Sequence, residues 1–284
     1  MSKLGIIGGS GLYDMPNLRA VEWIGIRTPF GKPSDKFLRA ELSGRDVIFL
    51  PRHGRGHHLL PGEINNAANI YAMKKLGVDT IISVSTVGSL RQEIKPMDIV
   101  IPDQYVDRTN QARSGTLFGN GLAAHITFSD PVCPVLSKLL FDAASALGLP
   151  AHAKGVYLNM EGPSFSTRAE SNLYRSWGMD IIGMTNLHEA RCAREAEICY
   201  ATLAMVTDYD CWHESDNASV DIIIQNLSRN IDNAKKILET VSSRLPQKRD
   251  CLCAGALKGA IITKPAAILA DVRKRLDIII GKYL

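Results

Sequence analysis

The 284-residue sequence lacks an apolar run long enough to cross a bilayer. The runs at 79–84 and 200–206 are among its longest, whereas a membrane-spanning helix needs about 20 apolar residues. Residues 1–5 also lack the apolar core of a secretory signal peptide. We therefore expect a cytoplasmic protein without a membrane partner.

The sequence also lacks a strong excess of charge of either sign. Lysine and arginine together number 33 and aspartate and glutamate 29, so the formal net charge is +4, and the charges are interspersed. Nucleic-acid-binding proteins carry a basic patch or stripe, so we expect no nucleic-acid partner. The small positive excess suits a small anionic substrate without identifying one.

Cysteine is scarce and scattered. Among the six cysteines, Cys251 and Cys253 form the one close pair. Structural zinc sites of this kind use two such pairs, so we expect no metal. Reduced, partly buried thiols are the expectation for all six, and whether Cys251 and Cys253 form a disulfide stays open.

Segments rich in isoleucine and valine recur along the chain and alternate with helix-like stretches, which predicts an α/β fold. The predicted strands span residues 3–7, 46–50, 80–84, 98–101, 155–160, 180–183 and 200–206. The predicted helices span residues 62–76, 131–147, 167–177, 219–243 and 265–280. The strands are almost continuously apolar, which indicates a sheet covered on both faces. No linker interrupts the pattern, so we expect one domain over residues 1–284, with a mobile excursion at 246–264.

Small polar or ionisable residues follow most of these strands. They occupy residues 8–11, 52–55, 85–89, 161–163, 184–185 and 207–210. In α/β sheets the carboxyl ends of the strands form the rim where ligands bind. We therefore expect these six strand ends to build one site.

The glycine turn at 8–11 is not a dinucleotide fingerprint, because Asp14 stands where the third glycine belongs. This weakens a dehydrogenase hypothesis. Pro33 after Gly31 and Lys32 likewise excludes a P-loop. The turn can still hold a single phosphate through backbone N–H groups and the Ser10 hydroxyl.

Arg52 and His53 add donors suited to the same anion. Arginine can grip a phosphate with two parallel N–H bonds. Zinc held by His53, His57 and His58 is the competing interpretation, and the absence of nearby carboxylate or thiolate ligands in sequence disfavours it. A solvated turn fits these residues equally well when they are taken alone.

Three hydroxyls and two acids complete the candidate set. Ser85, Thr86 and Thr185 lie at strand ends, where a hydroxyl alone often caps a helix. Asp208 and Asp210 are two apart in an extended segment, so both point to one side. Burial and mutual repulsion raise the pKa of such a pair, and a protonated carboxyl can act as general acid to a nitrogen leaving group.

Several motifs follow one another in a specific order. They are residues 5–12, 28–34, 52–55, 88–91, 161–163, 168–170 and 207–212. In this order they resemble the methylthioadenosine phosphorylases of the purine nucleoside phosphorylase superfamily, from residue 4 to residue 284. The resemblance implies single-domain α/β subunits with a mixed central β-sheet flanked by helices, assembled as a homotrimer or a hexamer. It also implies phosphorolysis of methylthioadenosine to adenine and 5-methylthioribose 1-phosphate, a glycosyl transfer without a cofactor in which inorganic phosphate is the co-substrate.

The resemblance assigns roles residue by residue. Phosphate binding falls to Ser10, Arg52, His53, Ser85, Thr86 and Thr185. Substrate binding falls to Phe165, Met184, Asp208, Tyr209 and Asp210, with Asp208 as the catalytic group near N7 and N6 of adenine. Ser166 and Val220 would set specificity, and His125 would close the 5′ end of a neighbouring subunit's site.

Two other functions stay open. Related branches that act on 6-oxopurines such as inosine or guanosine tend to carry asparagine at the position of Asp208, whereas a carboxylate accepts a hydrogen bond from a 6-amino group. A non-catalytic nucleoside-binding protein on the same fold would not need the phosphate set. The stretch 186–189 departs from the family pattern, and we expect His188 to lie at the surface.

Overall fold

The predicted strands belong to one mixed sheet. The computed structural model describes residues 2–9, 11–110, 113, 115–213 and 220–284, with the backbone alone for 220–224. The strands are β1 (Leu4–Gly8), β2 (Arg19–Ile24), β3 (Phe37–Leu42), β4 (Arg45–Pro51), β5 (Thr80–Ser89), β6 (Ile99–Val100), β7 (Gln104–Arg108), β8 (Ala151–His152), β9 (Val156–Met160), β10 (Ile181–Gly183) and β11 (Cys199–Tyr209). Their order is β2-β3-β4-β1-β5-β10-β9-β7, with β11 on β5, β6 on β11 and β8 on β6.

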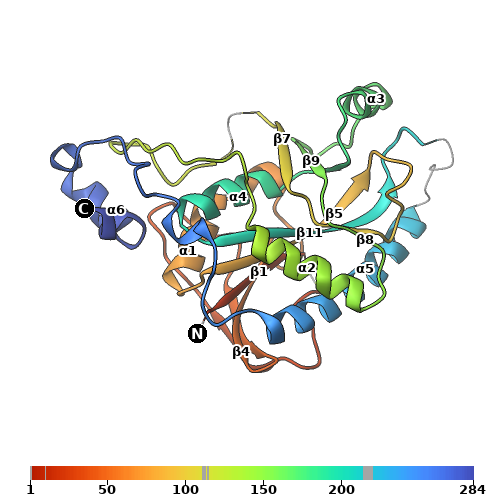
Figure 1. The fold of residues 1–284 in the computed structure, drawn as a ribbon, viewed down its shortest axis with the longest axis horizontal. Helices are drawn as coiled ribbons and strands as arrows, with labels where there is room; N and C mark the ends of the chain where they lie inside the picture. The colour runs from red at the N-terminus through yellow and green to blue at the C-terminus, as the bar shows by residue number, and fades with distance from the viewer. Residues whose placement is uncertain (1, 10, 111–112, 114, 214–219) are drawn as a thin grey trace.

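Helices cover the sheet on two sides (Figure 1). They are α1 (Asn66–Lys75), α2 (Pro134–Ala146), α3 (Arg168–Ser176), α4 (Asn186–Glu195), α5 (Val220–Arg244) and α6 (Ala270–Ile280), and short 3-10 turns span Pro61–Glu63, Leu252–Gly255, Pro265–Ala267 and Gly281–Tyr283. α2 packs against α5, and α1 packs against α4. Within the described ranges, no helix combines the length and apolarity that a membrane span requires.

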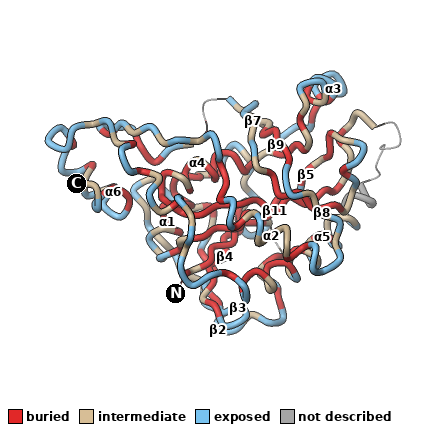
Figure 2. The backbone as a smooth tube through the Cα atoms, viewed as in Figure 1, coloured by how far each residue is buried: buried red, intermediate tan, exposed pale blue. Residues whose placement is uncertain are grey.

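Successive side chains along a strand point to opposite faces of the sheet and pack into two separate hydrophobic cores. Ile6 packs with the α2 and α5 residues, whereas the next residue, Ile7, packs with α1 and α4. In β4, Phe49 likewise packs in the core with α2 and α5, and Ile48 packs in the core with α1 and α4. The prediction of a sheet covered on both faces is therefore confirmed, and Figure 2 shows the buried residues concentrated in the central strands.

Some predictions about the fold were wrong. β2, β3, β7, β8 and α4 were not predicted. β2 lies next to β3 and is mostly exposed, so it gives no run of buried apolar residues. Residues 246–264 are not a mobile excursion, since Cys253, Leu257 and Ala260 are buried. Ile261 also forms a β-bridge with Ala124. The small side chains of this segment bury little area each, so its sequence gives a weak apolar signal.

Candidate active site

The strand ends meet because strands run towards one another along β5. β1 is parallel to β5 and reaches Ser83 with Ile7. β10 begins beside the end of β5, with Ile181 opposite Ser89, and runs antiparallel to it. The carboxyl ends of β1 and β10 therefore face each other beside the middle of β5, where Ser85 lies. The expected rim of parallel strands is replaced by two opposed groups of strand ends.

Neighbouring strands add their own ends to this place. β4 is parallel to β1, and Arg52, which follows β4, donates its backbone N–H to the Gly8 carbonyl at 2.9 Å. β9 is parallel to β10 and brings in Glu161. β11 is parallel to β5 and ends at Tyr209.

Arg52 forms the buried centre of one side of the site. Its side chain pairs with Glu189 on α4, with Nε donating to Oε1 at 2.5 Å and Nη2 to Oε2 at 3.3 Å. It also donates to the Val84 carbonyl at 3.0 Å and to Ser83 Oγ at 2.5 Å. Burial alone would lower the pKa of Arg52, but the Glu189 carboxylate raises it above its ordinary value. The guanidinium therefore stays charged.

This arrangement changes what Arg52 can offer an anion. A guanidinium has five N–H donors, and Arg52 uses four of them on protein acceptors within the described part of the chain. The fork-like, two-bond grip expected for phosphate is taken by Glu189 instead. Arg52 is left with its positive charge and one N–H on Nη1.

His53 is a neutral acceptor in this setting. Its Nδ1 lies 2.8 Å from the Leu59 carbonyl oxygen, so Nδ1 must carry the hydrogen and Nε2 has a free lone pair. Burial, and then the charge of Arg52, lowers the pKa of His53 to about 4. The Nε2 atom can accept a hydrogen bond from the O–H of a monohydrogen phosphate.

Hydroxyl groups follow the part of β5 that Arg52 contacts and precede α4, which carries Glu189. Ser85 and Thr185 are buried, and Thr86 beside them is exposed. Thr185 precedes α4, yet its hydroxyl does not cap the helix, so the ordinary structural role of such a hydroxyl is not in use. Ser10, the remaining predicted phosphate ligand, lies outside the described residues.

Sequence reasoning missed Tyr157 on β9. Its ring is fully buried, and its hydroxyl has no hydrogen-bond partner among the residues that the structure describes. Ser85 and the Thr185 backbone are close enough to lower its pKa, but burial outweighs them and raises it. Gly183 makes room for it, because a Cβ there would lie 2.0 Å from the Tyr157 oxygen. A buried hydroxyl without a partner next to Ser85 and Thr185 can serve a bound oxyanion.

The two predicted acids lie at the other end of β5. The register of β11 shifts between Val206 and Asp208, which places Asp208 opposite Gly88. A Cβ on Gly88 would lie 3.5 Å from Asp208 Oδ2 and 3.6 Å from the Asp210 Cβ. Both acids therefore lie beside the same glycine, as the spacing predicts, and glycine leaves the space beside them open.

The two acids differ in their surroundings. Thr207 donates its hydroxyl to Asp208 Oδ1 at 2.5 Å. Asp210 is 7% exposed, and its Oδ2 has no hydrogen-bond partner among the described residues. Burial raises the pKa of Asp210, and the nearby Ser171 hydroxyl offsets part of the rise. The site thus holds a carboxyl that keeps its proton to higher pH than usual.

The loop before α3 carries an exposed aromatic ring and is tied to the segment that follows the acids. Phe165 is 81% exposed. Its neighbour Ser166 accepts a hydrogen bond from the Cys211 thiol through its carbonyl at 3.2 Å, which ties the loop to the segment after Asp210. Thr167 and Glu170 form a capping box that fixes where α3 begins.

Arg113, which sequence reasoning also missed, joins the ends of β9 and β10. It pairs with Glu161 through Nε and Oε1 at 3.1 Å and donates to the Met184 carbonyl at 2.6 Å. Glycine suits position 162, because its φ is +70° and a Cβ there would lie 2.6 Å from Met184 Sδ. Arg113 thus fixes the position of Met184.

Tyr209 and His125 are not brought to this place. The Tyr209 ring packs against Trp212 and His213, and its hydroxyl donates to the Gln92 carbonyl. His125 is exposed, and its segment pairs with the C-terminal part of the chain, where the His125 backbone N–H donates to the Ala260 carbonyl at 2.9 Å. The side chain of Val220 lies outside the described residues.

The expectation that His188 lies at the surface was wrong. It is 3% exposed, its Nδ1 has no partner among the described residues, and burial lowers its pKa. Its position on α4 turns it towards Gly115, where a Cβ would approach its ring to 2.9 Å.

Comparison with known proteins identifies the family. The model of the phosphorylase superfamily matches residues 3–243. The chain belongs to this superfamily. The S-methyl-5′-thioadenosine phosphorylase of Geobacter sulfurreducens is 58% identical over 282 residues, which cover 99% of each chain. A methylthioadenosine phosphorylase from an antarctic soil metagenomic library has a crystal structure that superposes with a TM-score of 0.92, at 47% identity and 98% coverage of both chains.

A more distant relative was solved with a ligand. The methylthioadenosine phosphorylase of Schistosoma mansoni in complex with adenine gives a TM-score of 0.83 at 30% identity, covering 92% of this chain and 99% of that one. These matches confirm the mixed α/β fold and the family expected from the sequence motifs.

Proposed function

We propose that this protein is an S-methyl-5′-thioadenosine phosphorylase, a pentosyltransferase that releases adenine and 5-methylthioribose 1-phosphate in purine and methionine salvage. One observation carries the proposal. A buried arginine with neutral donors and acceptors lies at one end of a short stretch of β5, and two acids lie at the other end. Relatives of that name at 47–58% identity over nearly the whole chain support the same substrate.

The anion end would receive inorganic phosphate. Arg52 would supply charge and one N–H, His53 an acceptor for the phosphate hydroxyl, and Ser85, Thr86 and Thr185 neutral donors, with Ser10 completing the set. A phosphate oxygen attacks C1′ of the nucleoside while the C1′–N9 bond breaks. Positive charge develops on the sugar, and the neighbouring phosphate stabilises it more strongly in the transition state than in the ground state.

The acid end would receive the leaving purine. The electron pair of the broken bond passes to the base, and Asp208 in its protonated form would deliver a proton to N7. The second oxygen of the same carboxyl can accept a hydrogen bond from the 6-amino group, which favours adenine over 6-oxopurines. Asp210 would share the proton with Asp208, because two neighbouring carboxyl groups resist being ionised together. General acid catalysis of this kind contributes on the order of 10²–10⁴-fold in rate.

Further residues would set the fit of the nucleoside. Phe165 would stack on the base, Met184 would contact the ribose, Ser166 would line the base end and Val220 the alkylthio end. His125 would close the site of a neighbouring subunit, and its exposed position suits that role. We accordingly propose a homotrimer of one-domain subunits, with a hexamer as the alternative.

The proposed enzyme is cytoplasmic and uses phosphate as co-substrate without a cofactor at this site. Its partners would be small molecules, with neither nucleic acid nor membrane among them.

The test is release of adenine from methylthioadenosine with and without phosphate. We expect release that depends on phosphate and yields a sugar phosphate. Equal rates in both conditions would mean hydrolysis and would overturn the proposal. Adenosine, inosine and guanosine form the comparison panel, and a large preference for inosine would identify a 6-oxopurine nucleoside phosphorylase instead.

A further inference from the structure

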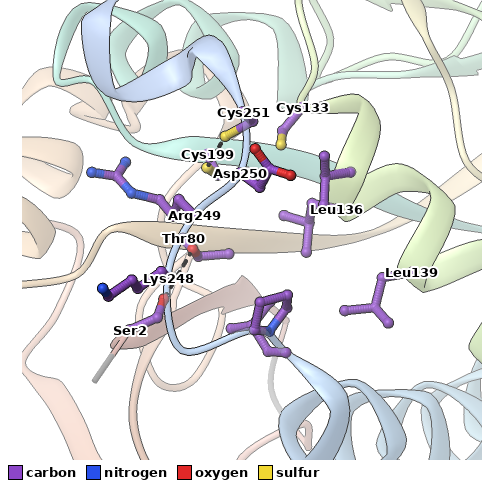
Figure 3. A pocket seen from close by; sticks show the side chains of 13 residues that line it. Ser2, Thr80, Cys133, Leu136, Leu139, Cys199, Lys248, Arg249, Asp250 and Cys251 are labelled. Atoms are coloured by element: carbon purple, nitrogen blue, oxygen red, sulfur yellow. Dashed lines mark hydrogen bonds between the residues drawn. The ribbon is translucent and has the colours of Figure 1, made fainter.

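Four of the six cysteines gather at one point, although they come from three distant segments. Cys133 precedes α2, Cys199 begins β11, and Cys251 and Cys253 lie at the 3-10 turn Leu252–Gly255. Their four Sγ atoms all lie within 4.8 Å of one another. Figure 3 shows Cys133, Cys199 and Cys251 turned towards a common centre.

The cluster is separate from the candidate active site. Cys133, Cys199 and Cys251 line a cavity of about 30 Å³. Ser2 and Thr80, at the amino ends of β1 and β5, line it too. The candidate active site instead lies where β1 ends and along the second half of β5. The cysteines therefore belong to the opposite end of the parallel strands, and the proposed reaction does not use them.

The geometry suits a single small ion. A tetrahedral zinc ion bound to thiolates has Zn–S distances of about 2.3 Å, which places the four sulfurs about 3.8 Å apart. The observed Sγ–Sγ distances lie on both sides of that spacing. The Sγ atoms of Cys199 and Cys251 are 3.2 Å apart, and no pair in the cluster is more than 4.8 Å apart. A small contraction or expansion of individual pairs is enough to form the tetrahedron.

The surroundings are already arranged for a closed site. Cys133, Cys199 and Cys253 are 2–4% exposed. The Cys133 backbone N–H donates to the Tyr200 carbonyl at 2.8 Å, so the α2 ligand is tied to the strand that carries the Cys199 ligand. We propose that Cys133, Cys199, Cys251 and Cys253 bind one structural Zn²⁺ as a tetrathiolate site.

The charge around the cluster also bears on this assignment. Four cysteines bind zinc as thiolates, so binding releases their protons. Lys248, Arg249 and Asp250 line the same cavity, so the lining carries one formal positive charge in excess beside the thiolates of the loaded site.

The ion would fasten the C-terminal part of the chain to the superfamily core. The superfamily model matches residues 3–243, so Cys251 and Cys253 lie beyond it, whereas Cys133 and Cys199 lie within it. The site thus joins residues 246–264 to α2 and β11. The sequence spacing hides this, because the second pair of ligands comes from positions 133 and 199 instead of from another close pair.

The experiment measures metal and thiols in the full-length protein. Protein purified with a phosphine reductant and no chelator is analysed for metals by mass spectrometry, and we expect about one zinc ion per chain. Replacement by Co²⁺ should give thiolate-to-cobalt charge-transfer absorption with the strong visible bands of tetrahedral cobalt. The double variant Cys251→Ser, Cys253→Ser should lose at least about ten-fold in bound zinc, and Cys192→Ala, a buried cysteine outside the cluster, should keep it.

Stability of the wild-type protein provides a second readout if the double variant does not fold. Removing zinc with a chelator should lower Tm, and adding Zn²⁺ back should restore it. Any of four results would overturn the assignment. They are four thiols that react with a thiol reagent while no metal is bound, disulfides among these cysteines in peptide mapping, iron in place of zinc, or an equal zinc content in the double variant. Because none of these readouts uses catalysis, they are independent of the proposed phosphorylase activity.

Discussion

Replacing Glu189 by glutamine tests whether the buried ion pair organises the anion end of the site. The side chains of Arg52 and Glu189 are 4% and 1% exposed. Glu189 Oε1 accepts from Arg52 Nε, and Oε2 accepts from Arg52 Nη2, from Ser83 at 2.6 Å and from Tyr200 at 3.0 Å. A glutamine side chain has one oxygen and one NH₂ group. Its NH₂ group would therefore face either the Arg52 Nε–H or the donors that now bind Oε2.

The magnitude follows from this mismatch. Glu189→Gln leaves the Arg52 charge buried without a counter-charge and opposes at least one donor with another donor. Breaking a buried ion pair costs about 3–5 kcal/mol of unfolding free energy. At about 2–4 °C per kcal/mol for a chain of this size, Tm should fall by about 6–20 °C. The free Nη1 hydrogen of Arg52 also loses its fixed direction, so the KM for phosphate should rise more than the KM for methylthioadenosine.

Thermal unfolding and steady-state kinetics of the variant measure both effects. Glu93→Gln is the matched control, because Glu93 is exposed and such a change alters stability by at most about 0.5 kcal/mol. If Glu189→Gln unfolds at the wild-type temperature and keeps the wild-type KM for phosphate, Arg52 does not depend on Glu189 and our account of the anion end is wrong.

Three further predictions concern single residues. Asp208→Asn should lose on the order of 10²–10⁴-fold in turnover of methylthioadenosine and raise the ratio of inosine to methylthioadenosine turnover; an unchanged ratio in a substrate panel would contradict the assignment. His53 has a folded pKa of about 4, below its ordinary 6.5, so the unfolded chain binds more protons between these values and this contribution to stability is lost as pH falls from 6.5 to 4. As pH falls from 6.5 to 4, the Tm of the wild type should therefore decrease more than the Tm of His53→Asn. A Tm difference that stays constant over this range would refute the lowered pKa of His53. Phe165→Ala should leave the unfolding free energy within about 0.5 kcal/mol, because the ring is exposed, yet raise the nucleoside KM about two- to twelve-fold through lost stacking; calorimetry and kinetics together decide, and an unchanged KM would remove Phe165 from the site.

The sequence predicted the strands well where the buried side chains are apolar. β1, β4 and β11 are continuous apolar runs covered on both faces, so their composition alone located them. It was a poor guide to α4, because that helix buries polar side chains. Asn186 and Glu189 are 0% exposed, and Glu189 finds its partner Ser83 106 residues away. A pattern that assigns polar residues to the surface cannot recognise such a helix, and the same reasoning misplaced His188.

The candidate site residues were proposed from the sequence as a set, but their geometry was not. Strand ends identified Arg52, Ser85 and Asp208, since small polar residues after apolar strands are visible in sequence. Whether β10 runs with β5 or against it depends on pairing between distant segments, which composition does not encode. Arg113 and Tyr157 were missed for the same reason, because the groups that lie beside each of them come from distant segments of the chain.

The opposed directions of β1 and β10 have a consequence for the mechanics of the sheet. In the strand order, β4 and β1 connect to β10 and β9 through β5, so a molecule seated between the facing ends touches two halves that share one central strand. Occupancy would tie those halves together, and at a ligand concentration of about 100 times Kd the folded state gains about 2.7 kcal/mol. Adding phosphate and adenine should then slow amide hydrogen exchange in β1 and β10 together, although no hydrogen bond of the sheet joins them directly.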